Sequence, residues 1–95
     1  MKNAKVEVVN AERKVEKAER KVEKAKAEVE NAERKVEKAL KMWESSEGEA
    51  KPIYKKRLDT AQNGLDTAQA GVKSAQNELE TYRAQLKQVL GWFIF

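Results

Sequence analysis

The feature that most constrains the fold of this chain is an apolar repeat of seven residues that runs through both of its halves. In most repeats a larger apolar residue at position a is followed three residues later by a smaller one, usually alanine, at position d. Apolar residues spaced alternately by three and four are typical of a helix that packs along its length against another helix. In the first half these positions are Ala4, Val8, Ala11, Val15, Ala18, Val22, Ala25, Val29, Ala32, Val36, Ala39 and Trp43. In the second half they are Tyr54, Leu58, Ala61, Leu65, Ala68, Val72, Ala75, Leu79, Tyr82, Leu86, Val89 and Phe93.

The two repeats complement each other when the chain folds back on itself at Gly48. In this antiparallel pairing the numbers of the paired residues sum to 97, so that Trp43 faces Tyr54 and Ala39 faces Leu58. Valine or leucine of one helix then fills the space beside alanine of the other. A parallel pairing would stack alanine on alanine in every second layer and leave gaps that lose packing contacts. Volume complementarity therefore favours the antiparallel arrangement.

The repeat predicts an all-α protein, a long antiparallel two-helix coiled-coil hairpin with an alanine-rich, Alacoil-like core. Alanine at position d allows the helix axes to approach closely. We expect a single domain over residues 1–95, with one helix over 4–44, a tip loop over 45–52 and a second helix over 53–93. Gly64 and Gly71 flank the core of the second helix, where each costs about 1 kcal/mol of helix propensity. Close backbone approach is one explanation for these glycines, and a softened helix is the other.

Composition excludes most kinds of chemistry. Charged residues make up 38% of the chain and aromatic residues 6%, and there is no cysteine and no histidine. Disulfides, thiolate and imidazole metal ligands, and Ser-His or Cys-His catalysis are therefore excluded within this sequence. The recurring glutamates Glu16, Glu23, Glu30 and Glu37 are seven residues apart, which indicates a solvated helix face and not an acid–base pair. We expect no enzymatic activity, no catalytic or metal-binding residues and no cofactor.

The charge balance is mildly basic, with 20 basic and 16 acidic residues and a net charge of +4. This balance permits binding to anionic surfaces but does not demand it. Nucleic-acid binding would need aromatic residues interleaved with basic ones along a face, and neither helical repeat has them. We expect no nucleic-acid partner.

The repeat breaks only between the two helices, and this tip is the best candidate for a binding site. Gly48 can take a left-handed conformation, and Pro52 suits the first turn of a helix. Aromatic residues in a mixed polar setting are suited to protein recognition. The alternative is that Trp43 and Tyr54 simply form an apolar plug that closes the coil. The candidate receptor-binding residues are Trp43, Ser45, Ser46, Glu47, Gly48, Glu49, Lys51, Pro52, Ile53, Tyr54, Lys55 and Lys56.

The C-terminal segment is too apolar to be left in water. It comprises Trp92, Phe93, Ile94 and Phe95. We expect it to pack on a neighbouring domain or to mediate self-association through another copy of the chain. A role at a membrane interface is a weaker alternative, because the flanking basic residues of such anchors are missing.

The chain resembles the receptor-binding coiled-coil hairpin of colicin-type bacteriocins. The likeness rests on Asn-Ala-Glu-Arg heptads in the first helix and on the segment Tyr54-Lys-Lys-Arg-Leu-Asp-Thr-Ala-Gln in the second. The resemblance implies a secreted antimicrobial protein whose hairpin apex binds an outer-membrane transporter as its receptor, with contacts falling around Trp43 to Lys56. The regular Val-Glu-Lys-Ala units of the first helix favour a rival interpretation, a structural spacer or a designed or engineered antiparallel coiled coil without a ligand.

Overall fold

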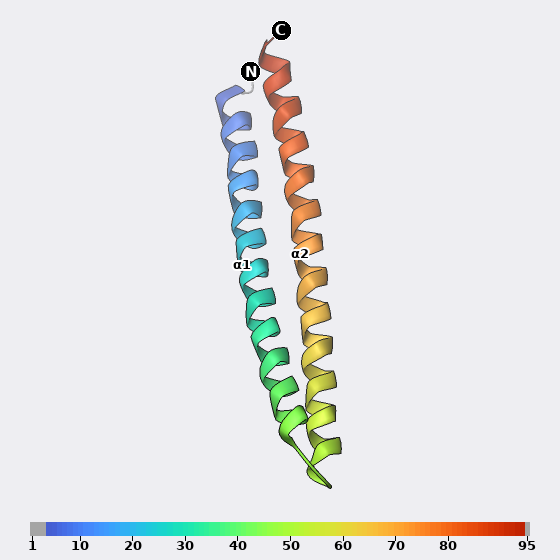
Figure 1. Ribbon diagram of the computed structural model, residues 1–95. Helices are drawn as coiled ribbons and strands as arrows, with labels where there is room; N and C mark the ends of the chain where they lie inside the picture. Colours follow the sequence, from blue (N-terminus) through green and yellow to red (C-terminus); the bar gives the residue numbers. More distant parts are fainter. Residues whose placement is uncertain (1–3, 95) are drawn as a thin grey trace. The chain divides into compact units, whose positions relative to one another are not determined.

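The computed structural model describes residues 4–94, and the side chains of residues 5–92. It contains two helices, α1 (Ala4–Ser45) and α2 (Ala50–Ile94), and no strand in the part that it describes (Figure 1). Phe95 and the side chains of Phe93 and Ile94, which we assigned to self-association or a neighbouring domain, lie outside the described residues. Over the described range, neither helix has a segment long and apolar enough to cross a membrane.

The helices divide into two units. The terminal unit comprises residues 1–24 and 73–95, and the tip unit comprises residues 25–72. In each unit a segment of α1 lies alongside a segment of α2 and runs in the opposite direction (Figure 1). The prediction of an all-α antiparallel helical hairpin is confirmed.

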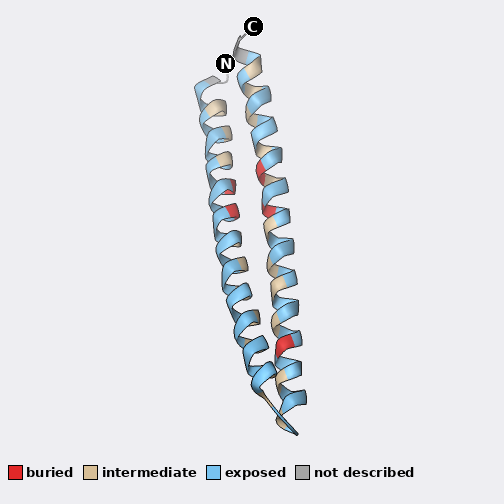
Figure 2. Cartoon of the chain, viewed as in Figure 1, coloured by how far each residue is buried: buried red, intermediate tan, exposed pale blue. Residues whose placement is uncertain are grey.

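The most buried side chains of the terminal unit follow the predicted pairing of large with small residues. Val22 was expected to face Ala75, and Ala18 to face Leu79. All four are buried, and the buried residues lie on the sides of the helices that face each other (Figure 2). Alternating apolar volumes therefore place the core where the repeat predicts it.

The core is thin. The buried apolar residues of the described chain are these four together with Leu58 of the tip unit, and the other apolar heptad positions are mostly half-buried. Two helices share a single interface, so each apolar side chain is covered from one direction only. Charged residues support this interface in the terminal unit, where Lys21 Nζ lies 3.1 Å from Glu78 Oε1 and Arg83 Nη2 lies 3.5 Å from Glu19 Oε2.

The connection between the helices is shorter than expected. The tip loop was predicted over residues 45–52, whereas α1 extends to Ser45 and α2 begins at Ala50. Pro52 therefore lies inside the first turn of α2, where the backbone N–H groups have no partner within the helix, so its missing donor is no loss. Gly48 takes a φ of +62°, in the left-handed region, and its carbonyl accepts a hydrogen bond of 3.3 Å from the backbone N–H of Lys51. These contacts reverse the chain within residues 46–49.

Candidate protein-binding tip

Trp43 is the centre of the tip. It is half-buried in the last turns of α1, and two ammonium groups of α2 lie over its indole ring. Lys51 Nζ is 5.1 Å and Lys55 Nζ is 5.3 Å from the ring centroid. The two lysines are four residues apart, which places them on one face of the helix. Each such cation–π contact contributes about 0.5–1 kcal/mol at an exposed site, so Trp43 is held in one orientation by the opposite helix.

The neighbouring side chains of α2 are ordered in the same way. Lys55 Nζ also lies 3.3 Å from Asp59 Oδ1, one turn further along the helix. Arg57 Cζ lies 5.3 Å from the centroid of the half-buried Tyr54 ring. Each of the two aromatic rings therefore has at least one cationic side chain over it, and these cationic side chains are exposed at the tip.

The serine residues after Trp43 serve the end of α1. Ser45 Oγ donates to the carbonyl of Lys41 at 2.9 Å, and Ser46 Oγ donates to that of Trp43 at 2.7 Å. Ser45 Oγ also lies 3.3 Å from the carbonyl oxygen of Met42, and the carbonyl of Trp43 also accepts the backbone N–H of Ser46 at 3.2 Å, so the two hydroxyls add hydrogen bonds to the end of the helix. Ser45 and Ser46 therefore have a structural role irrespective of any binding.

Three apolar side chains in the last turns of α1 and the first turn of α2 are exposed. Met42 is 44% exposed and Ile53 is 57% exposed. Leu40, which is 38% exposed, was not among the candidate residues. Its heptad position could have revealed it, because the equivalent positions in the preceding repeats of the helix, such as Glu33 and Lys26, carry charge.

The structure brings part of the predicted set together and leaves the rest separate. Trp43, Lys51 and Lys55 form one cluster, and Tyr54 pairs with Arg57, a residue that was not in the predicted set. Five further exposed members make no hydrogen bond, ion pair or ring contact with this cluster among the described residues. These are Glu47, Glu49, Pro52, Ile53 and Lys56.

The arrangement defines a class of structure, a two-helix antiparallel hairpin with a compact tip. Comparison of the chain with protein-family models, with curated proteins and with solved structures gave no match. The hairpin architecture is therefore what is established, and no family is identified.

Proposed function

We propose that this protein is a non-enzymatic binding module whose tip docks onto the surface of another protein. The observation that carries the proposal is that two apolar residues of the tip, Met42 at the end of α1 and Ile53 at the start of α2, are exposed, while Lys51 and Lys55 lie over the indole ring of Trp43. Binding hot spots commonly combine a rigid aromatic residue with apolar and cationic neighbours. Burying a fully exposed isoleucine side chain contributes roughly 1.5–3 kcal/mol, and Ile53, which is 57% exposed, has about half of this to gain from a partner.

The tip is also prepared for binding before a partner arrives. The contacts between Trp43 and the two lysines, and the ion pair between Lys55 and Asp59, restrict side chains that would otherwise lose freedom on association. Ordering a flexible side chain costs about 0.5–1.5 kcal/mol at an interface. Because the side chains of Trp43, Lys51 and Lys55 are already ordered, a partner that covers Met42 and Ile53 would avoid part of that cost.

For the identity of the partner we rely on the resemblance to the receptor-binding hairpins of colicin-type bacteriocins. We propose an outer-membrane receptor protein as the partner, and a secreted bacteriocin as the protein to which the hairpin belongs. The exposed lysines around Ile53 are suited to a receptor surface that carries carboxylates.

The second candidate function is that of a structural spacer or designed hairpin without a ligand. It is favoured by the half-burial of Trp43 and Tyr54. Rings that neighbouring cations cover can serve simply as an apolar plug between the helices, with no role in binding. Under this alternative the exposed Met42 and Ile53 have no role.

Retention of solubilised outer-membrane proteins on immobilised chain separates the two functions. We expect the immobilised wild-type chain to retain a receptor, and an excess of free wild-type chain to displace that receptor. The Ile53→Asp variant should be at least about tenfold weaker both in retaining the receptor and in displacing it. Val6→Asp is the matched control, because Val6 is 51% exposed and lies in the terminal unit. Circular dichroism checks that both variants keep their helices. Equal retention by Ile53→Asp and wild type would refute the proposal and leave the spacer.

A further inference from the structure

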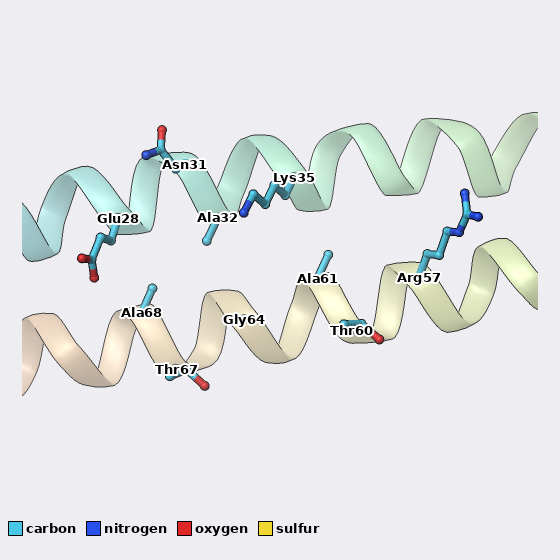
Figure 3. Close-up of a pocket in the computed structure, with 10 residues that line it drawn as sticks. All are labelled: Glu28, Asn31, Ala32, Lys35, Arg57, Thr60, Ala61, Gly64, Thr67 and Ala68. Carbon is cyan, nitrogen blue, oxygen red and sulfur yellow. The ribbon is translucent and has the colours of Figure 1, made fainter.

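A groove of the tip unit lies away from the tip, between α1 and α2. It has a volume of about 580 Å³, and its lining residues come from both helices (Figure 3). In the close-up, Ala32 of α1 and Ala61 and Ala68 of α2 point into the space between the helices, with Gly64 between the last two. Small side chains therefore form its floor.

The groove exists because α2 lacks a side chain where the terminal unit has one. Lys21 and Glu78 occupy matching flanking positions of the two helices, and their residue numbers sum to 99. They form the ion pair of 3.1 Å. In the same register Lys35 is matched with Gly64, and a Cβ atom at Gly64 would have no neighbour within 4 Å. The α2 side of the groove therefore has no side chain at residue 64.

This geometry corrects one expectation for the glycines. Close backbone approach was one explanation for Gly64 and Gly71, but an added Cβ at either residue would meet open space. The hairpin itself gains no packing from these glycines. The absence of a side chain at Gly64 leaves the groove accessible from outside.

Two hydroxyl groups that line the groove already have hydrogen-bond partners. Thr60 Oγ1 donates to the carbonyl of Lys56, and Thr67 Oγ1 donates to that of Asn63, each at 3.0 Å. Both hydroxyls lie on the α2 side of the groove and have their partner within the helix. Covering a polar group that is already hydrogen-bonded avoids the cost of an unsatisfied one.

The groove is self-complementary in charge and in shape. On α1, Glu28 and Lys35 are one heptad apart with opposite charges, and no ion pair engages either of them among the described residues. On α2, Ala61 and Ala68 are also one heptad apart, with Gly64 near their midpoint. A two-fold rotation about an axis midway between Glu28 and Lys35, level with Asn31 and Ala32, would bring Glu28 of one copy opposite Lys35 of the other.

From this we propose that the groove docks a second copy of this chain, groove to groove and antiparallel, with the two-fold axis midway between Glu28 and Lys35 and with Gly64 in the contact. An isologous contact of this kind closes at two copies. Opposite charges placed at equal distances from the axis favour the chain's own groove over an unrelated helix, because each copy supplies one partner to each of two ion pairs. The surface is separate from the tip, so the inference does not depend on the proposed function.

Sedimentation equilibrium of the full chain, from about 10 μM to about 1 mM, tests the dimer. We expect the mass to rise from one copy to two and to go no further. Gly64→Gln puts a long, neutral, helix-favouring side chain into the groove, and should weaken self-association by at least about tenfold. Ala70→Gln is the matched control, because Ala70 is exposed on the same helix and does not line the groove.

Two charge variants test the register. Lys35→Glu and Glu28→Lys each place like charges across the axis, and each should weaken self-association about tenfold, whereas their equimolar mixture should restore the dimer. Lys38→Glu and Glu30→Lys make the same charge changes at exposed positions outside the groove and should leave association unchanged. Circular dichroism of every variant checks the helices.

Several results would overturn the inference. They are a single copy at all concentrations, assembly beyond two copies, a dimer that tolerates Gly64→Gln, and a mixture that associates no better than its components. Loss of the dimer on Trp92→Ala with retention in Gly64→Gln would place self-association at the C-terminal segment instead.

Discussion

Replacing the two flanking glycines of the tip unit with alanine should stabilise the hairpin. Gly64 and Gly71 lie inside α2, where glycine is about 1 kcal/mol less favourable than alanine because it retains more freedom in the unfolded chain. An added Cβ at either residue would meet no atom within 4 Å, so no steric cost offsets this gain. The residues are two helical turns apart, and their effects should add to about 2 kcal/mol.

Thermal unfolding followed by circular dichroism measures the effect. Unfolding entropy is about 2.1 cal/mol/K per residue, or about 0.2 kcal/mol/K for 95 residues, so 1 kcal/mol corresponds to about 5 °C. We expect a Tm about 5 °C higher for each single variant and about 10 °C higher for the double variant. The scans are run at about 5 μM, to keep self-association out of the comparison.

The matched control is Ala70→Gly, which makes the reverse change at an exposed position of the same helix. It should lower the Tm by about 5 °C. If Gly64→Ala left the Tm unchanged or lowered it while Ala70→Gly behaved as expected, the open space beside Gly64 would be wrong. The explanation of the groove would then fail with it.

Three further changes test the loop, the ion pairs and the core. Gly48→Ala forces a Cβ into a φ of +62° and should cost about 1–2 kcal/mol in urea unfolding, whereas Glu47→Ala in the same exposed loop should cost little. Glu78→Gln removes the partner of Lys21 and should lower the free energy of unfolding by about 0.2–1 kcal/mol at low salt and by almost nothing at about 1 M salt. Equal losses at both salt concentrations would contradict an exposed ion pair. Glu80→Gln, at a nearby exposed position, is the control. Leu79→Ala should lower the free energy of unfolding by about 2–5 kcal/mol because Leu79 is only 8% exposed, and Leu90→Ala should lower it clearly less because Leu90 is 42% exposed. A lower urea midpoint for Leu90→Ala than for Leu79→Ala would refute the assigned core.

Some contacts of the tip could not be predicted from the repeat. The position of Lys51 over Trp43 depends on α2 beginning at Ala50, and the heptad pattern placed that start at residue 53. Helix ends depend on which backbone groups find partners in the turn, and the repeat carries no information about them. Leu40 could have been found, because an apolar residue replaces charge at its heptad position.

By itself the sequence determined the helices, their antiparallel pairing and the location of the core. Val22 with Ala75 and Ala18 with Leu79 follow from period and side-chain volume, which are local properties of the chain. Only the tertiary structure decided what surrounds Gly64. A glycine beside a helix interface permits either close contact or an open groove. The choice depends on the distance between two helices, which is set by all the layers together and not by the residue itself.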